Sequence, residues 1–441
     1  MKELMLYIDP GTGSMLFTVL IGILGTAFYL LRGLLVKIRF WISGGKSDKK
    51  GAEDRIPFAV FSDSKRYWNL FGPVCDEFEK RGQKLLYLTA SPDDPALQKT
   101  YENVSCEFIG EGNKAFAKLG FLKADVLLST TPGLEVYQWK RSKDVKWYVH
   151  APHAASDITI YRMFGLDYYD AVLLSGEYQI DQIRQLETLR KLPEKELKLV
   201  GVPYLDAMKK RLEEADPLPP HPVTVLLAPS WGPSGILSRY GEKAVRALLN
   251  TGYHVIVRPH PQSFTSEKEM LEKLMAAFPE SEQLEWNRDN DNFEVLRRSD
   301  VMISDYSGVI FDYSLIFDRP VIYADTSFDK SPYDAAWLED ELWTFQTLPK
   351  IGRALKEEDL GRIREVIDGM IGNPKYQAAI EAARKETWCH VGEGAERIAD
   401  YMIRKEENLA EEARKAAAGR QKAEKKKEKK RDRSAVPKKE G

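Results

Sequence analysis

The sequence predicts an α/β protein built from two doubly wound parallel sheets, and three observations lead to this expectation. Short apolar runs alternate with helical stretches across most of the chain. A proline-rich stretch at residues 216–222 interrupts the alternation once, and the pattern restarts after it. The two ends differ from this body, because the chain opens with a long apolar run and closes with dense charge.

The composition is that of a globular protein with a sizeable core. Of 441 residues, 43% are hydrophobic and 30% are charged, which excludes a disordered or collagen-like chain. Three cysteines without CxxC spacing make a disulfide framework or a structural zinc site unexpected. The overall charge is −2, but residues 1–50 carry 7 basic and 3 acidic side chains and residues 414–441 carry 13 and 4, which leaves −15 on residues 51–413. Such an acidic body argues against nucleic acid as a partner.

An uncharged run at residues 15–31 predicts a membrane helix. As a helix its 17 residues span about 25 Å, and the residues up to Val36 extend the span if a basic side chain within them snorkels. Glu3 and Asp9 before the run, and the bulky residues after it, argue against a signal peptide. We therefore expect a transmembrane anchor at 15–36, with a monotopic hairpin or an interfacial helix as the alternative.

Basic residues after the apolar run set the expected orientation. By the positive-inside rule, residues 1–14 face outward, residues 37–54 form a basic linker at the inner surface, and the catalytic domains are cytoplasmic. The expected location is therefore the cell membrane, with a single pass. The basic residues are Arg32, Lys37, Arg39, Lys46, Lys49 and Lys50.

Residues 55–215 predict the first domain. Strand candidates alternate with helix candidates such as 67–80 and 177–190, as in a parallel sheet that helices cover. The strand candidates are Phe58–Ser62, Lys84–Thr89, Val126–Ser129, Lys146–His150, Ala171–Ser175 and Leu197–Val200.

Residues 216–222 predict a linker, and residues 223–413 predict a second domain of the same kind that ends in helices. The strand candidates are Val223–Leu227, His254–Val257, Val301–Ser304 and Val321–Tyr323, and helices are expected near 240–250, 267–277, 292–298, 308–317 and within 356–413. Two such domains in succession leave a cleft between them, and ligands bind there at the carboxyl ends of the strands.

The basic tail at residues 414–441 is of low complexity. Its composition predicts disorder or a loosely held charged helix. A role in solubility and a role on anionic lipid both remain open.

Histidines follow two of the predicted strands. His150 and His153 come after the apolar strand that includes Tyr148, and His260 lies in Arg-Pro-His-Pro directly after another strand. Arg258 and His260 in a rigid, proline-flanked loop suit a phosphate, with the guanidinium as a bidentate donor and the imidazole as a donor or acid. An ordinary strand-to-loop turn is the alternative interpretation.

A second cluster spans residues 301–313. The strand there ends in a turn of small and polar residues, and a helix follows, so free N–H groups and the helix dipole could bind an anion. Simple capping of the helix is the alternative. Asp289-Asn290-Asp291 resembles a DxD metal motif but stands in a polar turn, so no metal site is expected there. The residues of the turn are Ser304, Asp305, Ser307 and Gly308.

The Arg-Pro-His-Pro loop, the Ser304–Asp325 segment and the upstream strand-end histidine together resemble one family. They are similar to the CDP-glycerol glycerophosphotransferases, the teichoic-acid primases and polymerases, which have a GT-B fold of two Rossmann-like domains. The resemblance covers roughly residues 145–335. The family typically has His-Gly and Asp-Tyr-Ser-Ser, whereas this chain has His150-Ala151 and Asp305-Tyr306-Ser307-Gly308.

The resemblance implies a set of roles. His150 would be the general base on an acceptor hydroxyl, with His153 as a second, acceptor-side candidate. Arg258 and His260 would hold the donor pyrophosphate, and His260 would also act in catalysis. The turn residues Ser304, Asp305, Ser307 and Gly308 would bind the same phosphates.

The implied reaction moves glycerol phosphate, or a related polyol phosphate, from a CDP-linked donor to a hydroxyl of a cell-envelope acceptor, which is expected to be lipid-linked, with release of CMP. No metal or other cofactor is required by it. Two alternatives remain: a GT-B glycosyltransferase that uses a nucleotide sugar, and a non-catalytic nucleotide-binding scaffold at the membrane. The oligomeric state does not follow from the sequence.

Overall fold

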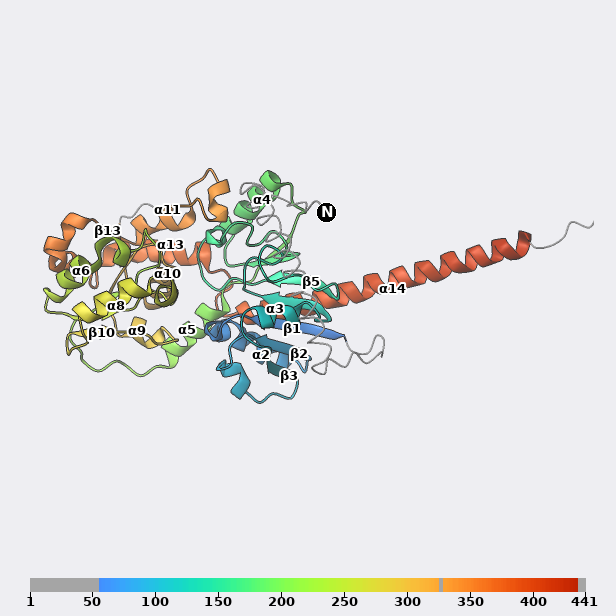
Figure 1. The fold of residues 1–441 in the computed structure, drawn as a ribbon, viewed down its shortest axis with the longest axis horizontal. Helices are drawn as coiled ribbons and strands as arrows, with labels where there is room; N and C mark the ends of the chain where they lie inside the picture. The colour runs from blue at the N-terminus through green and yellow to red at the C-terminus, as the bar shows by residue number, and fades with distance from the viewer. Residues whose placement is uncertain (1–54, 325–327, 435–441) are drawn as a thin grey trace, which may run out of the picture. The chain divides into compact units, whose positions relative to one another are not determined.

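The computed structural model describes residues 55–324 and 328–434, and the side chains of residues 420–434 are not part of that description (Figure 1). The described chain contains a seven-stranded sheet and a six-stranded sheet, and all strand pairs in both are parallel. Within these ranges no helix is long and apolar enough to cross a membrane. The anchor predicted at 15–36 lies outside the described residues.

The first sheet has the strand order β3-β2-β1-β4-β5-β6-β7. Alternate residues of each strand point to opposite faces, so Phe58 and Val60 of β1 join one core cluster while Ala59 and Phe61 join another. Helices therefore cover both faces. The elements are β1 (Ile56–Ser62), η1 (Lys65–Tyr67), α2 (Trp68–Lys80), β2 (Leu85–Thr89), η2 (Pro95–Gln98), β3 (Val104–Phe108), α3 (Asn113–Leu119), β4 (Ala124–Ser129), β5 (Val145–His150), η3 (Ile158–Ile160), β6 (Ala171–Leu174), α4 (Tyr178–Arg190), β7 (Glu196–Leu199) and α5 (Pro203–Glu214).

The second sheet has the order β10-β9-β8-β11-β12-β13 and a single large apolar core around it. Its elements are β8 (Thr224–Leu227), α6 (Ile236–Leu249), β9 (His254–Val257), α7 (Ser263–Ser266), α8 (Lys268–Ala277), β10 (Leu284–Trp286), α9 (Phe293–Arg297), β11 (Val301–Ser304), α10 (Val309–Phe317), β12 (Val321–Ala324), η4 (Asp334–Trp337), α11 (Trp343–Ile351), β13 (Gly352–Leu355), η5 (Glu357–Arg362), α12 (Ile363–Asp368), η6 (Pro374–Tyr376) and α13 (Gln377–Thr387). The prediction of two doubly wound, Rossmann-like domains is confirmed.

The last helix, α14 (Gly394–Ser434), returns to the first sheet (Figure 1). Ile398, Ala399 and Met402 are fully buried in the core cluster that also holds strand β1. The sequence-based boundary had grouped residues up to 413 with the second domain. The structure instead packs 394–409 on the first domain, because the apolar face of this helix is completed by helix α2 and the strands there.

The two domains also contact each other through buried polar groups. The Asp157 carboxylate, in the first domain, accepts hydrogen bonds from the backbone N–H groups of Trp343 (3.0 Å) and Thr344 (2.8 Å) at the start of α11. Asp334 in turn accepts from the N–H of Phe164 (2.7 Å). These contacts fix the carboxyl-end edge of the first sheet relative to that of the second sheet. The residues at the two edges are thereby positioned relative to each other.

Candidate active site

Strand register brings the predicted site residues to the edges of the two sheets. In the first sheet Ser129 lies beside both Phe61 and His150, so the ends of β1, β4 and β5 are level. In the second sheet Leu227 lies beside both Val257 and Ile303. Arg258, directly after β9, and Ser304, the last residue of β11, therefore lie at the same edge of the second sheet.

His153 stands on the loop after β5 with a fixed proton arrangement. The Thr130 hydroxyl lies 2.8 Å from the Ala151 carbonyl, to which it can only donate, and 2.9 Å from Nδ1 of His153. Because the single hydroxyl proton points to the carbonyl, Nδ1 carries the proton and donates to Thr130. The lone pair of His153 is then on Nε2. Tyr67 packs against the same ring, with 5.1 Å between the ring centroids.

Burial holds the pKa of His153 well below its usual range. Desolvation is the larger cause and the nearby Arg66 guanidinium the second, and together they lower the pKa to about 4. His153 is therefore neutral at neutral pH, and its Nε2 lone pair is unprotonated.

His150, the expected base, lies behind His153. It is fully buried, its Nε2 is 3.2 Å from the Tyr161 hydroxyl, and its Nδ1 has no hydrogen-bond partner. The same Tyr161 oxygen lies 3.2 Å from Nδ1 of His153. Desolvation, with a smaller contribution from His153, lowers the pKa of His150 to about 3. In this arrangement the His150 ring is enclosed, with the Tyr161 hydroxyl at its Nε2.

His260 has the opposite arrangement of its ring nitrogens. The Gln262 backbone N–H donates to Nδ1 of His260 at 3.1 Å, so the proton of the neutral ring is on Nε2. Burial chiefly, and Arg66 next, lower the pKa of His260 to about 4, although Glu267 acts in the other direction. A neutral His260 is thus a hydrogen-bond donor, which is what a phosphate oxygen requires.

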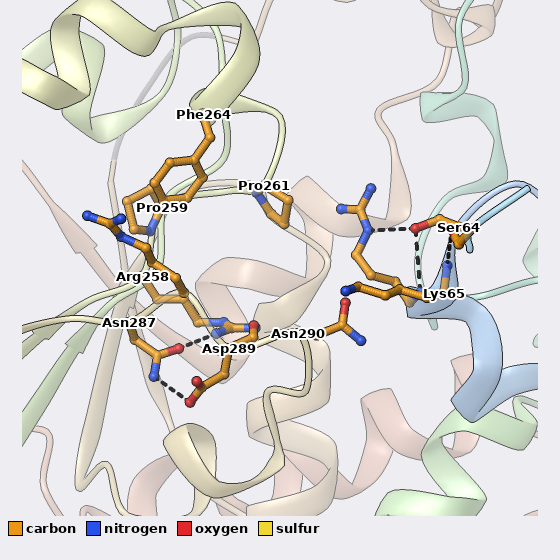
Figure 2. A pocket seen from close by; sticks show the side chains of 12 residues that line it. Ser64, Lys65, Arg258, Pro259, Pro261, Phe264, Asn287, Asp289 and Asn290 are labelled. Atoms are coloured by element: carbon orange, nitrogen blue, oxygen red, sulfur yellow. Dashed lines mark hydrogen bonds between the residues drawn. The ribbon is translucent and has the colours of Figure 1, made fainter. Parts of the chain in front are cut away.

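Arg258 is held in place from the neighbouring loop. One terminal nitrogen donates to the Asn287 side-chain carbonyl, and the other donates to the Asp289 backbone carbonyl at 2.8 Å. Asn287 in turn donates to the Asp289 carboxylate at 2.8 Å. These contacts fix the guanidinium at the rim of a cavity rather than leaving it in solvent (Figure 2).

In the turn after β11, the side chains of Ser304 and Asp305 point into the protein. The Ser304 hydroxyl donates to the Ala228 carbonyl at 2.6 Å, and the buried Asp305 carboxylate accepts from the N–H groups of Ser230 (2.9 Å) and Ile236 (3.1 Å). Both side chains are thus used to fasten the neighbouring loop and do not offer themselves to a ligand. The expected direct phosphate contact of these two side chains does not fit this geometry.

Gly308 does face the opposite domain. Gly308 precedes α10, and the N–H groups of Ile310 and Phe311 close the first turn by donating to the carbonyls of Ser307 (3.1 Å) and Gly308 (3.0 Å). A Cβ on Gly308 would stand 3.7 Å from the Ala154 Cβ and 4.0 Å from the Ser156 hydroxyl, both on the loop that carries His153. The amino end of α10 and the histidine loop therefore lie against each other across the two domains.

A cavity of about 390 Å³ opens between the domains beside these groups. Figure 2 shows Ser64 and Lys65 on one side and Arg258 with Asn287 on the other. Arg66 and Arg288 also line it, so four cationic side chains surround one space. Clustered cations of this kind favour a ligand with several negative charges.

The contributions of Lys65, Arg66 and Arg288 were not predicted from the sequence. The sequence did contain a signal for Lys65 and Arg66: they stand three and four residues after Ser62, the end of the predicted strand Phe58–Ser62, and ligands of such sheets bind at the carboxyl ends of strands. Arg288 follows the short strand β10, which was itself missed.

The acidic residues near the cavity are engaged with protein groups. Asp291 pairs with Arg211 at 2.5 Å, and the Asp289 carboxylate accepts from Asn287. Across residues 55–324 and 328–434 no cluster of three or more metal-ligating side chains occurs. Asp312 is buried on α10, where desolvation raises its pKa to about 7 and Tyr204 and Asn292 hydrogen-bond to it.

Taken as chemistry, the site offers a proton acceptor at His153, a neutral donor at His260 and several fixed cations. That combination suits in-line attack of a hydroxyl on a phosphorus atom, because it supplies a base, charge stabilisation and positioning.

Comparisons with known proteins support the same class. A family model, CDP-glycerol:poly(glycerophosphate) glycerophosphotransferase, matches residues 112–404. The chain belongs to this family. It is a transferase of the CDP-glycerol glycerophosphotransferase type, and the resemblance seen in the sequence is confirmed.

Solved structures with a similar fold include two with TM-scores of 0.51. The wall teichoic acid polymerase TagF is 16% identical over 80% of this chain and 90% of its own, and S. aureus MnaA, solved with UDP, is 12% identical over 79% and 96%. At these identities the likeness concerns the fold, which is GT-B-like. No curated protein matches the sequence.

Proposed function

We propose that this glycerophosphotransferase moves glycerol phosphate, or a related polyol phosphate, from a CDP-linked donor to a hydroxyl of a lipid-linked acceptor. The acceptor oxygen attacks the phosphorus that bears the polyol, and a new P–O bond forms. The bond from that phosphorus to the bridging oxygen breaks, and CMP leaves with the bonding electrons. The proton of the acceptor hydroxyl goes to the protein, so atoms and charge balance.

His153 is the proposed proton acceptor. The expectation of a base on this loop is kept, but the role moves from His150, because His153 has its lone pair on Nε2 and His150 is enclosed. His150 and Tyr161 are then positioning residues that hold the His153 ring from behind. A correctly placed base of this kind contributes about 10²- to 10⁴-fold to the rate.

The donor diphosphate is proposed to lie between Arg258, His260 and the amino end of α10. Arg258 offers fixed N–H groups, His260 offers its Nε2–H, and Ser307 with Gly308 offers backbone N–H groups. Arg66 adds a positive charge from the opposite domain. The scheme requires no metal ion.

The location is proposed from the sequence. An anchor at 15–36 followed by basic residues would keep the catalytic domains at the cytoplasmic face of the cell membrane, where a lipid-linked acceptor would be presented. A soluble acceptor would give no reason for such an anchor.

A single observation carries the proposal: two neutral histidines with opposite proton arrangements, one from each domain, both feel the charge of Arg66, which lines the cationic cavity. A nucleotide-binding scaffold would need the cations but not the base.

The test is CMP release from CDP-glycerol by the full chain in membranes, beside His153→Ala, His260→Ala and the matched control His221→Ala, which removes an exposed linker histidine. We expect loss in the first two variants and wild-type release in the control. Turnover of a UDP- or CMP-linked sugar in place of CDP-glycerol would indicate a glycosyltransferase. Donor binding without turnover of any donor would indicate a scaffold.

A further inference from the structure

Residues 411–419 of helix α14 are not packed on the rest of the described protein. The last partly buried apolar contact of this helix with the core is Leu409, and each residue from Glu411 to Gly419 is exposed. The helix continues to Ser434, so about 24 residues, or about 36 Å, extend past the core. A helix exposed on all sides gains nothing from burial, and what it contacts must suit its charge.

This arm leaves the protein at the amino-end edge of the first sheet, opposite the active site. Lys405 pairs with Glu196, the first residue of β7, and its ammonium lies 3.7 Å from the centre of the Trp147 ring near the start of β5. Glu406 interacts with Asp125 and Lys146, which are near the starts of β4 and β5. At residues 405 and 406 the helix therefore lies at the edge of the sheet where β4, β5 and β7 begin.

The chain from the amino terminus enters at the same edge. Arg55, directly before β1, donates to the Ala124 carbonyl at 3.1 Å, and its guanidinium lies 3.9 Å from Asp125. Asp125 also pairs with Lys146 at 2.6 Å, and Glu406 interacts with both. One cluster of side chains thus surrounds both Arg55, where the described chain begins, and Glu406, where the arm departs.

We propose that the distal part of α14, residues 414–433, binds the anionic headgroups of a lipid bilayer. This stretch has 11 basic and 3 acidic residues, and its only apolar side chains are alanines, so it would lie on the surface by charge and not insert. A bilayer is favoured over a nucleic acid because the described chain begins with Arg55 at the same edge, and the sequence before it has basic residues at 37–50 after the uncharged run 15–31.

The inference does not rest on the transferase reaction. It predicts that the amino-end edge of the first sheet lies near the membrane surface. Each basic residue near an anionic surface contributes about a fivefold factor in binding, so removing three should weaken the contact of the arm about 100-fold. The contact should also disappear in high salt, because screening shortens the reach of charges to a few ångströms.

The test uses the full chain reconstituted in vesicles and labelled with a fluorescent donor at Ala418→Cys, in a background of Cys106→Ala and Cys389→Ala. Energy transfer to an acceptor-labelled lipid reports how close the arm lies to the bilayer. Vesicles of phosphatidylcholine alone are compared with vesicles that contain one third phosphatidylglycerol. The charge variant is K425Q/K426Q/K427Q, and a matched control, K268Q/K273Q/K350Q, removes three exposed lysines of the second domain.

We expect higher transfer with phosphatidylglycerol than with phosphatidylcholine alone, with the difference lost in 0.5 M salt and in the charge variant but kept in the control. Equal transfer in the two vesicle types would overturn the proposal. Displacement of the arm from phosphatidylglycerol vesicles by poly(U) RNA at equal charge would also overturn it, in favour of a nucleic-acid partner. Because CMP release is not measured here, failure of the proposed reaction would leave these outcomes unchanged.

Discussion

The acid limb of the pH–rate profile should lie far below the ordinary histidine range. The proposed reaction needs neutral His153 to accept a proton and neutral His260 to donate through Nε2. Burial, assisted by Arg66, lowers both pKa values to about 4. The sign follows directly: a lowered pKa keeps an imidazole neutral to lower pH, so activity is present above about pH 4 and is lost below it.

The size of the effect is large at pH 5.5. A histidine with a pKa of about 4 is about 97% neutral there, whereas one at its ordinary value of about 6.5 is about 9% neutral. With both histidines required, kcat/KM should keep about nine-tenths of its plateau at pH 5.5. If both histidines had their ordinary pKa, kcat/KM at pH 5.5 would be about 1% of its plateau.

The assay is initial CMP release at low CDP-glycerol between pH 4.5 and 8, which reports the free enzyme. Arg66→Gln should move the acid limb upward while keeping it below 6.5, because one cause of the shift is removed and desolvation stays. Lys273→Gln, an exposed change on α8, should leave the limb in place. An acid limb near pH 6.5 in the wild type would refute the reasoning.

Three further results are expected. Thr130→Val should lower kcat by about 10- to 100-fold in the CMP assay, because it removes the hydroxyl that orients the His153 ring. Tyr161→Phe leaves Thr130 in place and should lower kcat less. Equal losses of kcat in the two variants would contradict the proton assignment. Arg258→Lys should raise KM for the donor about tenfold with a smaller change in kcat, since a point charge replaces a fixed fork; an unchanged KM would remove Arg258 from the donor site. Asp157→Asn should cost about 2 to 3 kcal/mol in urea unfolding, because buried N–H donors of α11 lose an acceptor, while Asp216→Asn in the exposed linker should cost nothing measurable.

The sequence predicted every central strand of the two sheets. All ten strand candidates are present, and nine of them are central strands, which in covered parallel sheets are continuous apolar runs; the tenth, β7, is an edge strand without a buried residue. The three missed strands, β3, β10 and β13, are all edge strands. Val104–Phe108 shows why: only Val104 is buried, so the segment has no run of apolar residues to detect.

The sequence predicted which loops form the candidate site, but not how individual side chains in those loops are oriented. The loops with His153, Arg258 and Gly308 were expected, since each follows an apolar strand. The choice between His150 and His153 could not be made, because it depends on Tyr161 enclosing one ring and Thr130 orienting the other. Such contacts join residues 8 to 23 positions apart through tertiary packing, which no local pattern records.

The position of Arg66 has a consequence for the donor complex. Its charge lowers the pKa of both His153 and His260 in the free protein. A bound diphosphate next to Arg66 would offset that charge, so the pKa of His153 should rise when the donor is present, and its Nε2 becomes a stronger base at the moment when a proton must be accepted. The acid limb of kcat, which reports the donor complex, should therefore lie at higher pH than the limb of kcat/KM. In Arg66→Gln there is no charge to offset, so the two limbs should separate by a different amount. If the acid limbs of kcat and kcat/KM coincided in the wild type, or were separated equally in the wild type and in Arg66→Gln, Arg66 would not couple donor binding to the base.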